Sequence, residues 1–314
     1  MQSRIVILSG NSNLPLTRKV CSLLGVAQCK AVVGRFSDGE VRVEVGENVR
    51  GMDVYVIQSM SPPINENLVE FLVLTDALKR ASARKINAVI PYYGYGRQDQ
   101  KDKPRVAVSS KMVADLLTVA GADRVITIDL HADQIEGFFK IPVDHLKTAR
   151  VLLEDLRKRL KGTEVVVAPD AGGVERARSF AKGLTVDLAI MDHRDTWDEA
   201  CSRIVGKVDG RRVIILDDMV DTGRTLIRTA EGARAAGAAS VEAYCVHAIL
   251  SGDACKSIEA SPIETLTVTD TVPLSPQVVA RWEKIRIISV APTLAEAIRR
   301  VHYEESVSSL ITRA

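Results

Sequence analysis

The chain has 314 residues, a length that suits two domains because single cores usually stop growing near ~250 to 300 residues. Its hydrophobic share of 46% and charged share of 26% are those of an ordinary globular protein, which excludes wholesale disorder. The net charge of +2 is too small to predict a nucleic-acid or membrane partner, although a local arginine and lysine cluster can still bind a phosphorylated small molecule.

Short β-branched runs alternate with helical stretches along the chain. The runs that predict strands are residues 4–8, 53–58, 88–91, 125–129, 164–168, 188–191, 213–216 and 241–246. Continuous apolar strands separated by helices are what a parallel sheet covered on both faces requires. The sequence therefore predicts an α/β fold with mainly parallel central sheets flanked by helices.

The two halves of the chain resemble each other. Gly121–Val125 is matched by Gly237–Val241 in the same place relative to a predicted strand. These identities are few, but together with the repeated order of strands and helices they favour two similar domains. We expect the domains to be residues 1–146 and 147–314.

The cysteines and the apolar runs bear on the cellular compartment. The five cysteines are scattered, odd in number and form no CxxC pair, which argues against a disulfide framework or a structural zinc site. No apolar run approaches the ~18 residues that a bilayer requires, and the start, MQSRIVILSGNSN, is too short in its apolar part for a signal peptide. We expect a soluble cytoplasmic protein.

The segment LDDMVDTGRTL, residues 216–226, follows an apolar strand and precedes a predicted helix. In open α/β sheets, ligands bind beyond the carboxyl ends of strands, where free N–H groups at a helix N-terminus favour anions. The turn 221–225 therefore predicts a phosphate site, and Asp217 and Asp218 lie where a sugar's hydroxyls need acceptors. The structural alternative, an aspartate N-cap followed by solvated charge, explains one acid better than this whole pattern.

Two further polar motifs follow predicted strands. DLHAD carries His131, and PDAGG carries Asp170 beside glycines that let backbone approach a ligand closely. A lone histidine beside a strand is more often structural than a ligand. Both residues are candidates for a ligand site at the sheet edge.

The run GYGRQDQKDKPR, at the end of residues 91–105, combines flexible glycines with four cations. These are Arg97, Lys101, Lys103 and Arg105. Such a loop can fold over a polyphosphate, although a charged run seen alone is more often a solvated surface loop.

Taken together, the motifs resemble those of the ribose-phosphate pyrophosphokinase family, the synthases of phosphoribosyl pyrophosphate (PRPP). The matching segments are GRFSDGE at 34–40, ENVRG at 47–51, PYYGYGRQDQKDKPR at 91–105, TIDLHADQIEGFF at 127–139, APDAGGVERAR at 168–178, DDMVDTG at 217–223 and EESVSSL at 304–310. They span the chain in the family's order. The resemblance implies two domains of the type I phosphoribosyltransferase kind and transfer of a diphosphoryl group from ATP to ribose 5-phosphate, giving PRPP and AMP.

The resemblance also implies roles for individual residues. The ribose 5-phosphate site would be Asp217, Asp218, Asp221, Thr222, Gly223, Arg224 and Thr225. ATP would be bound by Arg97 and Gln98, with Asp38, Gly39 and Glu40 supplied by a neighbouring subunit, and Mg²⁺ by His131 and Asp170. The active site would then be completed only in an oligomer.

In family members that respond to phosphate and ADP, the effector site lies between subunits. The matching residues here are Arg50, Ser82, Arg105, Ser306 and Ser308, all suitable anion ligands. A serine seen alone is more often a solvated hydroxyl or a helix cap. We expect a homohexamer or another assembly of dimers.

The sequence departs from the family at the loop after the predicted strand 188–191. Active synthases carry a lysine, any residue and an arginine there, whereas this chain reads His193, Arg194 and Asp195. His193 and Arg194 are therefore the candidate catalytic cations. Loss of one preorganised charge contact at a transition state typically costs on the order of 3 to 4 kcal/mol. Arg224 is a second departure, since the family usually has a small residue there, and it either crowds the phosphate or adds a contact to it.

These departures leave two functions open. One is an active ribose-phosphate pyrophosphokinase with a modified loop. The other is a catalytically weak paralogue that co-assembles with an active synthase as a regulatory or structural subunit. A phosphoribosyltransferase that consumes PRPP is disfavoured, because the loop 91–105 has no role in it.

Overall fold

The computed structural model describes residues 4–193 and 202–311, and it divides into two compact units. Unit 1 holds the described residues up to Lys147 together with Thr271–Pro273 and the stretch from Ser289 to 311. Unit 2 holds residues 148–270 and 274–288, apart from the undescribed stretch 194–201. The C-terminal stretch thus differs from the contiguous second domain expected from the sequence. The reason is tertiary packing, because α9 (Ala291–His302) packs against α1 (Leu14–Leu24) of unit 1.

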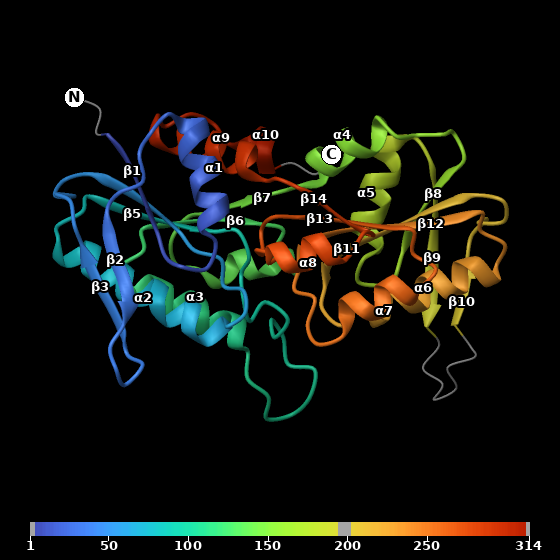
Figure 1. Ribbon diagram of the computed structural model, residues 1–314, viewed down its shortest axis with the longest axis horizontal. Helices are drawn as coiled ribbons and strands as arrows, with labels where there is room; N and C mark the ends of the chain where they lie inside the picture. The colour runs from blue at the N-terminus through green and yellow to red at the C-terminus, as the bar shows by residue number, and fades with distance from the viewer. Residues whose placement is uncertain (1–3, 194–201, 312–314) are drawn as a thin grey trace. The chain divides into compact units, whose positions relative to one another are not determined.

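Unit 1 is built on a five-stranded parallel sheet in the order β1-β4-β5-β6-β7. Figure 1 shows α2 and α3 on one face of this sheet and α1 and α9 on the other. The strands are β1 Ile5–Ser9, β4 Asp53–Ile57, β5 Lys85–Ile90, β6 Arg124–Ile128 and β7 Val143–Leu146, with an antiparallel hairpin of β2 Ala31–Arg35 and β3 Val41–Val45. The other helices are α2 Ile64–Arg80, α3 Ser109–Ala120, the 3-10 helix η1 Asp133–Phe138 and α10 Ser308–Ile311.

Unit 2 is built on a seven-stranded sheet in the order β10-β9-β8-β11-β12-β13-β14, parallel except for β10 at its edge. Its faces are covered by α4 and α5 on one side and by α6 and α7 on the other (Figure 1). The strands are β8 Glu164–Ala168, β9 Asp187–His193, β10 Ser202–Val205, β11 Arg212–Val220, β12 Ser240–Ala248, β13 Thr265–Thr269 and β14 Ile285–Ile288. The helices are α4 Ala149–Arg157, α5 Val174–Leu184, α6 Arg224–Ala235, α7 Ala254–Ala260 and α8 Pro276–Arg281.

The predicted α/β class with mainly parallel sheets is confirmed, and each predicted strand overlaps an observed one. The central strands could be predicted from the sequence because they are buried throughout: all five residues of both β4 and β8 are buried. In each unit, apolar side chains from one face of the sheet form a core cluster with the helices that cover that face, α2 and α3 in unit 1 and α6 and α7 in unit 2. The repeated glycines also correspond: Gly121 and Gly237 both have positive φ and connect a helix, α3 or α6, to the next strand. The local conformation favours glycine, which explains the match.

A buried ion network lies at the amino ends of the central strands of unit 2. The Arg212 guanidinium is 2.6 Å from Glu242 and 3.0 Å from Glu164, and all three side chains are at most 8% exposed. Two carboxylates that share one cation are costly to leave unpaired in a protein interior. This network supports the sheet at the end opposite to the predicted phosphate turn.

No helix among the residues that the structure describes is both long enough and apolar enough to cross a membrane.

Candidate functional site

The predicted phosphate turn lies between β11 and α6 in unit 2. Gly223 has φ of +76°, and a Cβ there would lie 3.2 Å from a side-chain carbon of Ile258, so both backbone conformation and space favour glycine. Helix α6 begins at Arg224, and the first N–H groups of a helix have no partner within the helix. Thr222, Arg224 and Thr225 are exposed around them. The turn therefore presents backbone donors and two hydroxyls at the positive end of a helix, as a phosphate requires.

Asp217 and Asp218 lie within β11, because the strand continues to Val220 and not only to residue 216 as predicted. The Arg176 guanidinium on α5 lies 3.5 Å from Asp217 and 3.4 Å from Asp218, so one cation faces two nearly buried carboxylates. Burial, and next the charge of Asp218, raise the pKa of Asp217 well above its ordinary value. Asp217 thus holds a proton more strongly than an exposed aspartate does.

Arg176 is a candidate functional residue that was not predicted from the sequence. It belongs to the segment APDAGGVERAR, but nothing in the spacing indicates which acids it meets. The order of strands supplies that information, since β8, which leads into α5, is the sheet neighbour of β11. A parallel arrangement of these two predicted strands would have been enough to infer the contact.

Asp170 follows β8 and lies at the same edge of the sheet as the Asp217 pair. Its Oδ1 accepts a hydrogen bond of 2.9 Å from Gly173 N, just before α5 begins. This contact fixes the carboxylate and occupies one of its two oxygens, so Asp170 can still offer an oxygen to a cation. The structure thus shows Asp170 hydrogen-bonded to the backbone just before α5, and its role as a Mg²⁺ ligand stays a prediction.

The next strand at this edge, β9, ends at His193. The strand brings the backbone of His193 to the carboxyl end of β8. The His193 side chain and the whole of Arg194 lie outside the described residues.

Arg224 borders a hollow of about 550 Å³ between the start of α6 and the segment that begins α7. The other lining residues include Thr222, Arg228, Ser251 and Ser257. Arg224 thus faces a surface recess shared with a second arginine, one turn further along the helix.

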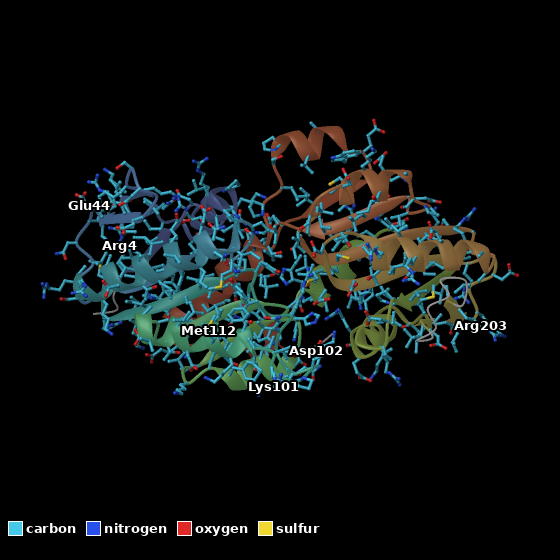
Figure 2. All side chains as sticks on the ribbon, turned by 90° about the horizontal axis from the view of Figure 1, so that it is seen from below. Arg4, Glu44, Lys101, Asp102, Met112 and Arg203 are labelled. Atoms are coloured by element: carbon cyan, nitrogen blue, oxygen red, sulfur yellow. The ribbon has the colours of Figure 1, made fainter. Side chains whose placement is uncertain are left out.

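In unit 1, the segment 91–108 leaves β5 at its carboxyl end and enters α3. The Gln98 side chain and carbonyl both contact the first turn of α3: Ser109 Oγ donates to Gln98 Oε1, and Ser110 N donates to Gln98 O at 3.2 Å. Arg97 is exposed, and Figure 2 labels Lys101 and Asp102 on the same segment. The segment is therefore anchored to α3 through Gln98, and its cations are exposed to solvent.

His131 follows β6, the sheet neighbour of β5, and its side chain is exposed. A Cβ built on Gly96 would lie 3.6 Å from the Cβ of His131. The glycine before Arg97 therefore lies beside the start of the His131 side chain, so these two predicted positions are near each other in unit 1.

Asp38, Gly39 and Glu40 form the turn of the β2–β3 hairpin. Gly39 has φ of +95°, Phe36 N donates to Glu40 O at 2.8 Å, and the Arg35 guanidinium donates to Gly39 O at 3.1 Å. The turn is exposed and internally hydrogen-bonded. It is a preformed surface that can be offered to another molecule.

The five predicted effector residues lie at two ends of the unit 1 sheet. Arg50 and Ser82 come just before β4 and β5, where Gly51 N donates to Ser82 O at 2.9 Å. Ser306 and Ser308 line a hollow of about 800 Å³ together with residues that begin β4, β5 and β6. Arg105 lies in the segment between the carboxyl end of β5 and α3. Four of the five are thus at the amino edge and one is at the carboxyl edge.

Comparisons with known proteins give the same answer over the full chain. Residues 5–121 match the family described as the N-terminal domain of ribose phosphate pyrophosphokinase, and residues 196–312 match the phosphoribosyl synthetase-associated domain. A ribose-phosphate pyrophosphokinase of Ralstonia nicotianae is 50% identical over 98% of both chains, and one of Bordetella pertussis is 51% identical over 97% of this chain and 99% of its own. This chain belongs to the ribose-phosphate pyrophosphokinase family.

A solved structure is also similar. The crystal structure of phosphoribosylpyrophosphate synthetase from Mycobacterium smegmatis has a TM-score of 0.92 and 37% identity, covering 96% of this chain and 100% of that one. The fold and the family expected from the motifs are both confirmed.

Proposed function

We propose that this protein is a ribose-phosphate diphosphokinase, which transfers the diphosphoryl group of ATP to the C1 hydroxyl of ribose 5-phosphate and releases AMP. The observation that carries the proposal is the carboxylate pair of β11 followed by the Gly223 turn at the start of α6. It occurs in a chain that is about half identical, end to end, to ribose-phosphate pyrophosphokinases.

The unit 2 residues would hold the acceptor substrate. The N–H groups of the turn 222–225 and the hydroxyls of Thr222 and Thr225 bind the 5-phosphate, as at other helix N-termini. Asp217 and Asp218 accept hydrogen bonds from the ribose hydroxyls, and Asp221 sits at the entry to the turn. Held at both ends, the sugar has its C1 hydroxyl fixed for in-line attack on the β-phosphorus of ATP.

The unit 1 residues would hold ATP. Arg97 supplies a guanidinium and Gln98 an amide from a segment tied to α3. The hairpin turn Asp38–Glu40 is exposed and preformed, which suits a contribution to a neighbouring subunit's site. The bond between the α- and β-phosphates breaks as the C1 oxygen bonds to the β-phosphorus, and AMP leaves.

The residues fit a Mg²⁺ requirement. Asp170 offers a hard carboxylate oxygen and His131 an exposed imidazole, and Mg²⁺ prefers few protein ligands while keeping several waters. When bound, Mg²⁺ neutralises charge on the polyphosphate oxygens. The carboxylate of Asp170 is held ready for this by Gly173 N.

An oligomer accounts for the distribution of the expected effector residues. Within one chain, Arg105 follows β5, while Ser82 precedes it, so a second copy must supply one of them if phosphate or ADP is bound by both. An exposed apolar stripe on α3, comprising Met112, Leu116 and Val119, is a suitable contact surface between copies. We propose a homohexamer or another dimer-based assembly.

A cytoplasmic location fits the free thiols among the described cysteines.

The regulatory-subunit alternative rests on one feature, the loop that begins at His193, and it predicts ATP and ribose 5-phosphate binding without turnover. Co-assembly with an active paralogue belongs to that alternative. The full-length relatives are named ribose-phosphate pyrophosphokinase, which supports the active enzyme over the regulatory subunit.

The test is a quenched-flow or steady-state assay with Mg²⁺, ATP and ribose 5-phosphate, in which AMP and PRPP are measured together. We expect equal amounts of both products, and none without ribose 5-phosphate. The variant Asp218→Asn should raise KM for ribose 5-phosphate about tenfold or more, because it removes a charged acceptor of hydroxyl hydrogen bonds. Binding of both substrates without product would reject the enzyme in favour of the regulatory subunit.

A further inference from the structure

The turn that leads from β6 to His131 is held by two backbone N–H groups that donate to β7, one to a carbonyl and one to a side chain. Asp129 has φ of +35°, unusual for a residue with a side chain, and its N–H donates to Leu146 O at 3.0 Å. The next N–H, of buried Leu130, donates to His145 Nε2 at 2.8 Å. The backbone immediately before His131 is therefore fixed by a side chain, and not only by the sheet.

His145 is suited to accept this bond. Its side chain is fully buried, and its Nδ1 lies against Glu136 Oε1 in η1. Because Nε2 accepts from Leu130 and Nδ1 faces a carboxylate, the hydrogen-bond partners assign the proton to Nδ1. Burial, and next the charge of Lys147, lower the pKa of His145, so the ring stays neutral and keeps its acceptor.

The cluster around His145 contains its own cation. Ligand atoms of Asp133, Glu136 and His145 lie within 4.8 Å of one another, a spacing that a metal ion can use. Lys147 Nζ, however, lies 2.8 Å from Asp133 Oδ1 and 2.9 Å from His145 Nε2. The ammonium group already supplies the positive charge between these groups, so we treat the cluster as a support for the ring and not as a metal site.

The position of this backbone also affects the segment that carries Arg97. A Cβ built on Gly96 would lie 3.6 Å from the Cβ of His131, so the glycine that leads into Arg97 lies beside the start of the His131 side chain. The start of the Arg97 segment is thus a neighbour of the turn that the His145 bond holds.

We propose that His145 is a positioning residue for the ATP side of the reaction: by accepting from Leu130 N–H it holds the turn that presents His131, beside which Gly96 begins the Arg97 segment. The proposal rests on the proposed function for its kinetic part, whereas its structural part concerns only the Leu130 amide. His145 itself touches no substrate in this account.

A matched pair of variants separates the acceptor from the bulk of the ring. His145→Gln places an oxygen near Nε2 and keeps an acceptor for Leu130, while His145→Asn places its polar atoms near Nδ1 and leaves Leu130 N–H without one. Loss of a partner for a buried N–H changes an equilibrium by roughly tenfold or more. We expect the Leu130 amide to exchange hydrogen about tenfold faster in His145→Asn than in wild type, and kcat/KM for ATP to fall by a similar factor. His145→Gln should stay within about threefold of wild type in both, and KM for ribose 5-phosphate should not change.

Hydrogen exchange and kinetics are measured on the assembled protein, with urea unfolding as the check on global stability. If His145→Asn does not fold, Glu136→Gln on the exposed side of the cluster should give the same changes with smaller amplitude. Unchanged Leu130 exchange in a folded His145→Asn or Glu136→Gln overturns the positioning role. Faster exchange with unchanged ATP kinetics overturns its importance for the reaction. Wild-type protein without turnover rejects the proposed function instead, and the exchange result still decides whether His145 holds the turn.

Discussion

Asp217→Asn tests the electrostatics of the carboxylate pair most sharply. Burial and repulsion from Asp218 raise the pKa of Asp217, and Arg176, at 3.5 Å, opposes this only in part because it also faces Asp218 at 3.4 Å. The native protein therefore keeps a proton on this site at pH values where the unfolded chain has released it. Asparagine has nearly the same shape and never needs that proton.

The sign and size of the effect follow from proton linkage. Between the unfolded pKa of aspartate, about 3.9, and the raised native pKa, the native state binds more protons than the unfolded state, so wild-type stability falls as pH rises. For one proton the slope is at most about 1.4 kcal/mol per pH unit. Asp217→Asn lacks this slope, so its stability relative to wild type should increase with pH through this window and level off above it.

The assay is urea unfolding of wild type and Asp217→Asn in roughly half-unit steps upward from about pH 4.5, just above the unfolded pKa of aspartate. Asp253→Asn, at an exposed carboxylate at the start of α7, serves as the control for a generic loss of negative charge. If the stability of Asp217→Asn relative to wild type stays constant or decreases as pH rises, the raised pKa of Asp217 is refuted. The inference that the two acids share one guanidinium is then refuted as well.

Three further results are expected. Gly223→Ala should destabilise the protein by about 1 to 2 kcal/mol and raise KM for ribose 5-phosphate, because φ is +76° and the added Cβ meets Ile258. Gly252→Ala is the control. It is also at positive φ, but no atom lies within 4 Å of the added Cβ, so KM for ribose 5-phosphate should stay unchanged. Arg212→Met should lower the free energy of unfolding by about 3 to 5 kcal/mol, because buried Glu164 loses its ion pair with Arg212 and buried Glu242 keeps, within the described part of the chain, only the one with Arg159, at 3.1 Å. The kcat per folded molecule should stay at the wild-type value, because the network lies at the opposite end of the sheet, and a lowered kcat in folded enzyme would contradict this. The double change His193→Lys with Asp195→Arg should raise kcat about tenfold or more if the loop limits turnover, and an unchanged kcat would show that the chain works without the family's cations.

The sheets were predictable because their strands are apolar throughout. Runs such as residues 53–58 and 164–168 can form buried strands from their own composition, and the turn at Gly223 is marked by the acids and hydroxyls around it. The family motifs then placed the expected substrate residues at the carboxyl ends of those strands. This part of the fold was predictable because the strands and the Gly223 turn depend on residues that are adjacent in the sequence.

What the sequence did not predict depends on contacts between distant segments. Strand β11 continues through two aspartates to Val220, since Arg176 and pairing with β12 compensate for them, whereas the apolar run ends at residue 216. The C-terminal stretch belongs to unit 1 because α9 packs on α1, and the sequence of neither helix indicates which element it packs against. His145 shows the same limit, as only the pairing of β6 with β7 brings its ring to Leu130.

The most direct test of the proposed reaction is the fate of the two terminal phosphates of ATP. ATP labelled at both the β- and γ-phosphorus is incubated with Mg²⁺, ribose 5-phosphate and the protein, and the products are separated. We expect both labels to appear together in PRPP, AMP to be unlabelled, and Asp218→Asn to slow the transfer of the labels at limiting ribose 5-phosphate. Label recovered in ADP, or a sugar product that carries only one labelled phosphorus, would contradict diphosphoryl transfer.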